Sequence, residues 1–211
     1  MTGEPRKIRL LMELRRAGVS DTKVLAAIER TPRELFVPEP FRDKAYEDIA
    51  LPIGAGQTLS RPAVVGRMTQ ALDTKDRMKI LEVGTGSGYQ TAVLARLCRR
   101  VYSVERHRSL LHEAEQRFKK LGLHNITAWI NDGNRGWPEQ APFERILVTA
   151  AAPDIPETLL SQLAPGGVIV VPVGPVHGEQ ILTRITRSGD GFESESLGPI
   201  RFVPLRAGRV S

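Results

Sequence analysis

The sequence lacks the features that mark secreted, membrane-spanning and disulfide-stabilised proteins. It holds a single cysteine, Cys98, among 211 residues, so an internal disulfide bond is impossible. A reducing compartment is the simplest interpretation, and we expect a cytoplasmic protein. No apolar run approaches the ~20 residues that a membrane-spanning helix needs. Residues 1–18 interrupt their apolar positions with charged side chains, which favours an amphipathic surface helix over a secretory signal.

Charge of one sign is not concentrated anywhere in the chain. Lys and Arg number 30 and Asp and Glu 24, which gives a net charge of +6. A basic balance can indicate a nucleic-acid partner, but these cations are spread along the sequence, and pairs such as Arg15-Arg16 fall on or just after expected helices. We therefore expect no nucleic-acid partner and no membrane partner, and a monomer. The four histidines lack metal-ligand spacing, so no metal is expected: His107, His112, His124 and His177.

Three stretches with different patterns form what we expect to be a single domain, 1–211. Residues 1–75 predict helices at 6–16, 21–30 and 63–72, with a glycine-containing substrate loop at 51–59. Residues 78–173 are expected to form a cofactor-binding core in which helices alternate with short apolar strands. The strands are predicted at 78–83, 101–105, 126–130, 145–150 and 168–173, and the helices at 89–97, 108–121 and 156–163. Such alternation predicts a Rossmann-like α/β fold, a doubly wound and mostly parallel sheet with helices on both faces. Residues 174–211 predict antiparallel strands at the sheet edge.

The strongest local signal is the segment Glu82–Tyr89 (EVGTGSGY), which leaves a predicted strand and opens a helix. That position is the carboxyl end of the sheet, where open α/β sheets bind ligands. A dinucleotide fingerprint reads G-x-G-x-x-G, whereas the third glycine here comes one residue early. The order E/D-x-G-x-G-x-G is typical of class I methyltransferases. The glycines Gly84, Gly86 and Gly88, with Thr85, are the predicted cradle.

S-adenosylmethionine suits this loop better than a nucleotide does. The loop has no Lys or Arg to hold a phosphate, and S-adenosylmethionine carries none. The ammonium of its methionine end could be attracted by Glu82, directly or through water. An NAD site and a plain turn are the alternatives.

Two further strand ends supply cofactor candidates. Glu105 follows Gly88 by 17 residues (105 − 88), and an acid in this place accepts hydrogen bonds from both ribose hydroxyls. A surface acid paired with Arg106 or Arg108 is the alternative. After the third strand, Asp132 could accept from the adenine amino group and the Gly133 N–H could donate to the ring, unless the segment is a plain turn.

A resemblance to one family lies outside the cofactor loop. Gly54–Ser60 (GAGQTLS) resembles the G-x-G-Q-T-[IL]-S signature of the protein-L-isoaspartate O-methyltransferases. The similarity continues through the glycine loop and over nearly the whole chain, in Asn131–Gly136 (NDGNRG), Pro142–Ala152 (PFERILVTAAA), Leu163–Gly174 (LAPGGVIVVPVG) and Phe202–Leu205 (FVPL).

That resemblance implies methylation of the α-carboxylate of L-isoaspartyl residues, the products of Asn deamidation and Asp isomerisation. The ester then closes to a succinimide, so the partners would be isoaspartyl-containing proteins and peptides. The resemblance places Ser60 at the acceptor as the catalytic residue, Thr149 beside the methyl donor, and closing strands in a variant order. It implies substrate contacts from Ile53, Gly54, Gln57, Thr58, Leu59, Val203, Pro204 and Leu205.

The residue chemistry agrees with such a reaction. A carboxylate acceptor, with a pKa of about 4, is already ionised at pH 7, so no general base is required. A simple helix N-cap is the alternative role for Ser60. Among other classes, a base-amino methyltransferase usually carries D/N-P-P-Y/F where this chain has Thr149–Pro153 (TAAAP). A non-catalytic cofactor-binding module, a dehydrogenase and a methyltransferase for a small molecule are further alternatives.

Overall fold

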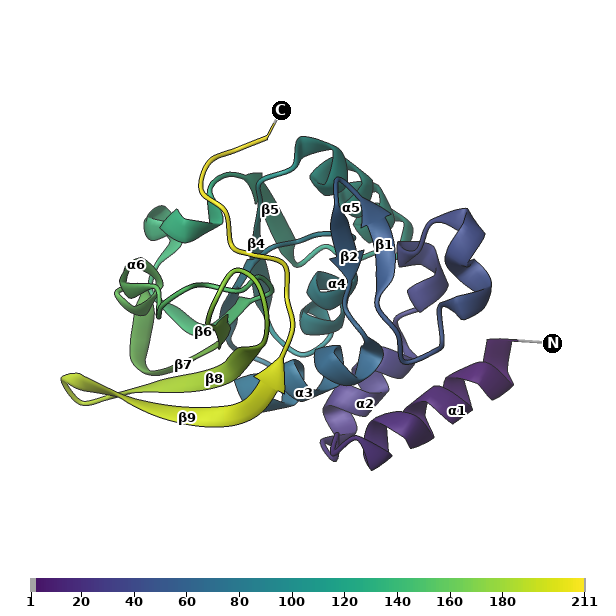
Figure 1. Cartoon of the computed structure of the whole chain (residues 1–211), viewed down its shortest axis with the longest axis horizontal. Coiled ribbons are helices and arrows are strands. Elements are labelled where there is room, and N and C mark those ends of the chain that lie inside the picture. Colours follow the sequence, from purple (N-terminus) through teal and green to yellow (C-terminus); the bar gives the residue numbers. More distant parts are fainter. Residues whose placement is uncertain (1–2, 211) are drawn as a thin grey trace.

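The computed structural model describes residues 3–210 and contains a seven-stranded sheet in the order β5-β4-β3-β6-β7-β8-β9 (Figure 1). Neighbouring strands from β5 to β7 run parallel, whereas β7, β8 and β9 pair antiparallel. The predicted sheet and its antiparallel edge are therefore present, with the last three strands side by side in chain order. The bounds are β3 (Lys79–Val83), β4 (Arg100–Glu105), β5 (Ile126–Ile130), β6 (Phe143–Val148), β7 (Leu163–Val173), β8 (Gln180–Ser188) and β9 (Gly191–Ile200).

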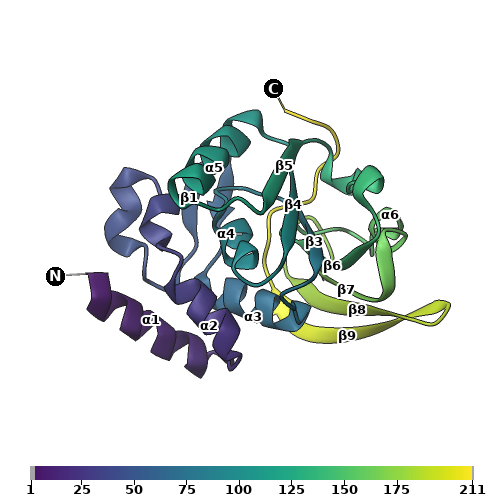
Figure 2. The ribbon, with the colours of Figure 1, turned by 180° about the vertical axis from the view of Figure 1, so that it is seen from behind.

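Both faces of the sheet are covered, which explains why its central strands are almost wholly apolar. On one face, Ile80 and Leu147 pack with Met68 and Leu94 under α3 (Pro62–Leu72) and α4 (Tyr89–Ala95). The other face packs against the short α6 (Glu157–Leu160). Figures 1 and 2 show α3, α4 and α5 on the opposite side of the sheet from α6. The remaining covering elements are α5 (Arg108–Lys120), η3 (Gly133–Arg135) and η4 (Pro138–Gln140).

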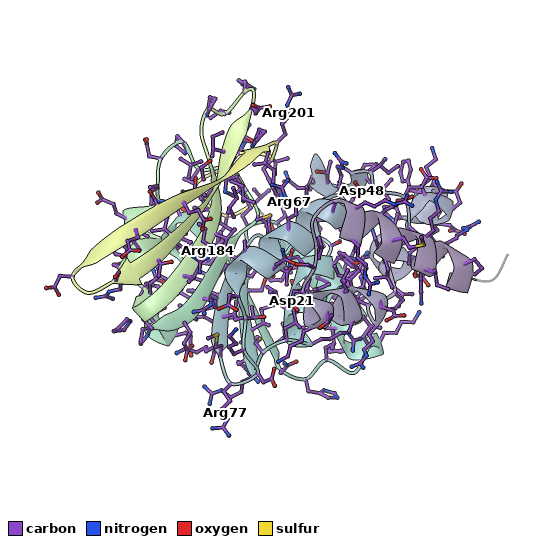
Figure 3. The ribbon with its side chains drawn as sticks, turned by 90° about the horizontal axis from the view of Figure 1, so that it is seen from below. Asp21, Asp48, Arg67, Arg77, Arg184 and Arg201 are labelled. Carbon is purple, nitrogen blue, oxygen red and sulfur yellow. The ribbon has the colours of Figure 1, made fainter. Side chains whose placement is uncertain are left out.

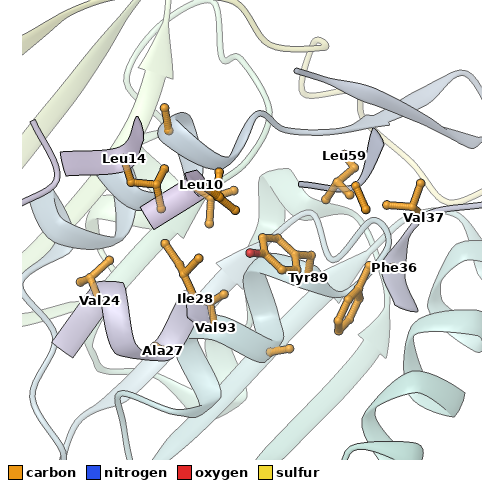
Figure 4. Packing of buried hydrophobic residues seen from close by; sticks show 14 of the residues in the cluster. Leu10, Leu14, Val24, Ala27, Ile28, Phe36, Val37, Leu59, Tyr89 and Val93 are labelled. Atoms are coloured by element: carbon orange, nitrogen blue, oxygen red, sulfur yellow. The ribbon is translucent and has the colours of Figure 1, made fainter. Parts of the chain in front are cut away.

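The amino-terminal helices share a core with the helix that follows the glycine loop. Leu10, Leu14 and Ile28 cluster with Tyr89 and Val93 of α4 (Figure 4). Because these residues belong to one apolar cluster, the amino-terminal helices pack against α4, one of the helices that cover the sheet. The elements of this region are α1 (Gly3–Arg16), α2 (Thr22–Glu29), η1 (Arg33–Phe36) and η2 (Glu39–Lys44).

Two predicted boundaries are wrong. The loop predicted at 51–59 is a hairpin of β1 (Leu51–Gly54) and β2 (Gln57–Leu59), because Leu51 and Ile53 alternate into the core while Pro52 and Gly54 face solvent. Its glycines, which suggested a loop, only form the tip. The helix predicted at 156–163 covers only α6, and β7 already begins at Leu163.

Helix α3 is fixed at its two ends by different parts of the chain. Near its carboxyl end, the Arg184 Nε of β8 donates to the Ala71 carbonyl at 3.0 Å, and Arg67 donates to the Leu197 carbonyl at 2.7 Å (Figure 3). At its amino end, the Ala63 N–H donates to the Asp48 carboxylate at 2.8 Å, and Arg61 pairs with the same carboxylate at 2.6 Å. Asp48 thus caps α3 from a distant loop.

This arrangement overturns the simple capping role considered for Ser60. The N-cap of α3 is Arg61, whose side chain makes no capping bond, and the helix begins at Pro62. Asp48 occupies the capping position, so the Ser60 hydroxyl is not needed there.

Removing the Asp48 carboxylate should loosen this end of α3. We expect Asp48→Ala to lower the free energy of unfolding by about 1–2 kcal/mol, the usual cost of a lost cap with an adjoining partly buried pair. Asp48→Asn keeps a side-chain oxygen as acceptor and should recover more than half of that loss. Chemical denaturation of the three proteins measures it, and equal stability of Asp48→Ala and the wild type would show that the cap contributes nothing.

Candidate active site

A cavity lies at the carboxyl ends of β3, β4 and β6, where the sequence places the cofactor. The β1–β2 hairpin and residues 202–206 each line part of it. Figure 1 shows the chain after β9 running past the hairpin towards the carboxyl terminus. The predicted residues that line the cavity on the cofactor side are Gly84, Thr85, Gly86, Glu105, Gly133 and Thr149. Those on the acceptor side are Ile53, Gln57, Thr58, Leu59, Ser60, Val203, Pro204 and Leu205.

The three glycines of the loop are required for different reasons. All have positive φ, +97° at Gly84, +54° at Gly86 and +88° at Gly88, which favours glycine. A Cβ on Gly84 would collide with the Thr149 hydroxyl, and one on Gly88 would stand 2.7 Å from the ring of Phe118 in α5. Of the three, Gly84 and Gly86 line the cavity, whereas Gly88 packs against α5, and its contact with the cofactor stays a prediction.

Glu105 is the fixed carboxylate of the cavity. Its Oε2 accepts the Gly86 N–H at 2.8 Å, and its Oε1 accepts the N–H groups of Arg106 and His107 at 2.8 and 2.9 Å. Glu105 is 5% exposed, and it forms no ion pair with Arg106 or Arg108 among the described residues, contrary to the alternative of a surface pair. Three backbone donors orient the carboxylate and leave it capacity to accept hydroxyl donors from a ligand.

Glu82 does not lie where the sequence suggested. It is fully buried and does not line the cavity, because its side chain points between β4 and α4. There its Oε2 accepts the hydroxyls of Thr91 at 2.5 Å and Ser103 at 2.6 Å. Burial raises the pKa of the Glu82 carboxyl to about 8 despite these hydrogen bonds, and the charge of Glu105 adds to the rise. At pH 7 it is therefore mostly neutral, and direct attraction of an ammonium by Glu82 is wrong.

Asp132 accepts hydrogen bonds from two backbone N–H groups. Its Oδ2 accepts the Gly208 N–H at 2.8 Å, and its Oδ1 accepts the Asn134 N–H at 2.9 Å. Asp132 does not line the cavity, whereas its neighbour Gly133 does. The Asp132 carboxylate thus fastens the carboxyl-terminal segment to the end of β5, and its contact with adenine stays a prediction.

The carboxyl-terminal segment 202–206 forms a wall of the cavity and is held by backbone hydrogen bonds. The Ala151 N–H donates to the Val203 carbonyl at 2.8 Å, and the Leu205 N–H donates to the Ala151 carbonyl at 2.7 Å. Thr149, two residues before Ala151, donates its hydroxyl to the carbonyls of Val83 at 3.0 Å and Gly84 at 2.7 Å. The end of β6 thus positions both the peptide-side wall and the glycine loop.

Ser60 faces the same cavity from the hairpin side. Its hydroxyl makes no hydrogen bond with the described part of the chain, while its carbonyl accepts from Arg33 at 2.8 Å. A hydroxyl free of internal partners can donate to an incoming carboxylate. Ser60 therefore has a geometry suited to an acceptor-binding residue.

Several lining residues were not singled out from the sequence, and one predicted substrate residue, Gly54, lies outside the cavity. Ser87 and Tyr89 stand within the glycine motif, and Arg106 and His107 directly follow Glu105. Their position next to predicted site residues could have indicated that they line the cavity. Met68 and Gln90 carry no local signal, because only helix packing brings them to the cavity.

Within residues 3–210 no group of three or more His, Cys, Asp or Glu side chains could hold a metal ion. None of the helices described is long and apolar enough to cross a membrane.

The buried Glu82 makes stability depend on pH in a defined direction. Its folded pKa of about 8 exceeds the ordinary 4.5, so between these values the folded protein holds a proton that the unfolded chain releases. Stability should therefore fall as pH rises through this window. Melting temperatures of the wild type and Glu82→Gln measured from pH 5 to pH 8 should diverge in favour of the variant as pH rises, since Gln does not titrate. A constant difference would contradict a raised pKa.

Comparison with known proteins agrees with the geometry. The protein-L-isoaspartate(D-aspartate) O-methyltransferase family matches residues 5–210. A protein-L-isoaspartate O-methyltransferase of Paramagnetospirillum magneticum is 66% identical over 206 residues, which cover 97% of this chain and 96% of the relative.

Two solved structures have the same fold. One, of a protein-L-isoaspartate O-methyltransferase, superposes with a TM-score of 0.84 and 28% identity over 94% of this chain and 65% of that chain. The other comes from Plasmodium falciparum, bears the same family name and was crystallised with S-adenosyl-L-homocysteine; its TM-score is 0.81, with 25% identity over 94% and 97% of the two chains. Sequence, fold and cavity thus agree, and the chain belongs to the protein-L-isoaspartate(D-aspartate) O-methyltransferase family.

Proposed function

We propose that this chain transfers a methyl group from S-adenosylmethionine to the α-carboxylate of L-isoaspartyl residues in damaged proteins and peptides. The ester product then closes to a succinimide, which begins repair. The proposal rests on one observation in a chain of this family. The same cavity is lined by Glu105, a carboxylate suited to bind ribose hydroxyls, and by Ser60, a hydroxyl suited to bind the acceptor carboxylate.

The cofactor side of the cavity has the groups that S-adenosylmethionine requires. Glu105, fixed by three backbone N–H donors, would accept the ribose hydroxyls, and Gly133 would lie against the adenine. Gly84, Thr85 and Gly86 would pass under the methionine end, where a side chain on Gly86 would reduce the space shared with Ile53. When bound, S-adenosylmethionine supplies an electrophilic methyl group that a carboxylate oxygen can take without a general base.

The acceptor side would measure the position of the carboxylate along the peptide. In an isoaspartyl linkage the main chain runs through the side-chain carbonyl, so the free carboxylate stands on Cα, one methylene closer to the chain than in aspartate. Ser60 would donate to this carboxylate while the backbone of Val203–Leu205 and the hairpin at Gln57–Leu59 hold the peptide. A misplacement of about 1 Å can cost on the order of a hundredfold in rate, which suffices for discrimination.

The working unit is proposed to be a cytoplasmic monomer that acts on polypeptides and not on nucleic acid. The lone cysteine, Cys98, is buried and unpaired, which agrees with a reducing compartment. We also propose that the three stretches of the chain have different functions. Residues 1–75 mainly bind the acceptor, residues 78–173 bind the cofactor, and residues 174–211 close the cavity.

Glu105 tests the cofactor assignment. Glu105→Gln keeps the size of the side chain but replaces one acceptor oxygen by a donor that would face backbone N–H groups. We expect S-adenosyl-L-homocysteine to bind at least about tenfold more weakly, since charge-assisted hydrogen bonds contribute about 1.5–3 kcal/mol. Isothermal titration calorimetry measures the affinity. Glu113→Gln, in an exposed ion pair on α5, is the control and should bind normally.

Two peptides of one sequence, containing L-isoaspartate or L-aspartate at the same position, test the acceptor. We expect strong methylation of the first and at least about a hundredfold less of the second, because the aspartyl carboxylate misses the in-line position. Incorporation of labelled methyl groups, with release of methanol as the succinimide forms, measures the reaction. Equal methylation of both peptides, or transfer to nucleic acid instead, would reject the proposed acceptor.

A further inference from the structure

Arg33 is a fully buried arginine next to the acceptor side of the cavity. It begins η1 and is 0% exposed, yet no sequence motif pointed to it. Arg33 is itself absent from the cavity wall. It contacts two residues that form that wall, Ser60 and Tyr89.

The guanidinium joins three segments that are distant in sequence. Its Nη2 donates to the Ser60 carbonyl at 2.8 Å and lies 3.5 Å from the Ile49 carbonyl. Its Cζ stands 4.8 Å from the centre of the Tyr89 ring, at cation–π distance. Ile49 precedes β1, Ser60 follows β2, and Tyr89 begins α4, so one planar group ties both ends of the hairpin to the helix behind the glycine loop.

The burial of this charge is not explained by an ion pair. Arg33 has no carboxylate within ion-pair distance among residues 3–210, and its Nε and Nη1 have no hydrogen-bond partner there. Burying an unpaired cation is costly, and a neutral side chain of similar volume would avoid that cost. No ion pair within the described chain accounts for an arginine at this position, and its contact with Ser60 supplies a functional reason.

We propose that Arg33 is a positioning residue for methyl transfer: by holding the Ser60 carbonyl, it fixes the Ser60 peptide group and keeps the hydroxyl directed at the acceptor carboxylate. This inference rests on the proposed function, since it concerns the same acceptor site. The opposite side of Ser60 is fixed by Asp48, which binds Arg61 and caps α3. Segment 33–48 thus holds the catalytic serine from both sides, although neither Arg33 nor Asp48 lines the cavity.

A double-mutant cycle tests the coupling. Arg33→Met removes the donor but keeps the length of the side chain, and it should lower the turnover of an isoaspartyl peptide by roughly tenfold while the affinity for S-adenosyl-L-homocysteine changes by less than about twofold. In a Ser60→Ala background, where no hydroxyl is left to orient, the same change should cost less than about threefold. Arg33→Lys retains a cationic donor and should recover part of the lost turnover.

The matched control is Arg145→Met. Arg145 is also buried and donates to backbone carbonyls, those of Asp73 and Glu144, but it lies at the opposite end of the sheet. We expect a lower melting temperature and unchanged turnover.

If Arg33→Met behaved like this control, or if its effect were the same with and without the Ser60 hydroxyl, the positioning role would be overturned. Should Arg33→Met fail to fold, Arg33→Lys is compared instead. Its loss of turnover should be larger in the wild type than in the Ser60→Ala background, and equal losses would overturn the positioning role. A wild type inactive on the isoaspartyl peptide would instead reject the proposed function.

Discussion

The structure of the site depends on one carboxylate, that of Glu105, and on the backbone groups it gathers at the end of β4. By accepting the N–H of Gly86, it draws the glycine loop of β3 towards the neighbouring strand. By accepting the N–H groups of Arg106 and His107, it fixes the turn that leads into α5. A group held in this way is oriented before any ligand arrives, so little reorganisation is required on binding. Beneath it, the neutral Glu82 and its two hydroxyl partners fill the interior without placing a second negative charge beside the first.

A second set of contacts holds the acceptor side against this cofactor side. The hairpin that carries Ser60 is short and cannot fix its own orientation, because two strands alone are marginally stable. Segment 33–48 supplies the support through Arg33 and Asp48, and Tyr89 connects it to the helix that follows the glycine loop. Catalysis of a displacement that needs no general base is mainly a matter of positioning. Segment 33–48 would therefore contribute to positioning although none of its residues lines the cavity.

Local patterns in the sequence predicted the parts of the fold and site that depend on local constraints. The alternation of apolar strands with helices gave the sheet, and the glycine motif with Glu105 gave the location of the cofactor cavity. The hairpin at 51–59 was missed because its glycines dominated a short alternation of Leu51 and Ile53. Glu82 was misplaced, and the backbone partners of Asp132 were not foreseen, because a sequence shows that an acid stands at a strand end but not which face of the sheet it points to or which distant N–H it meets. Arg33 could not be found, since its partners are 16 and 27 residues away along the chain.

Donor and acceptor are proposed to meet in one cavity between Glu105 and Ser60. A crystal structure with S-adenosyl-L-homocysteine and an L-isoaspartyl peptide would show whether they do. We expect ribose hydroxyls on the Glu105 carboxylate, the Ser60 hydroxyl on the free α-carboxylate, and that carboxylate facing the sulfur of the bound product. A peptide bound outside the wall formed by Val203–Leu205, or a carboxylate turned away from Ser60, would contradict it.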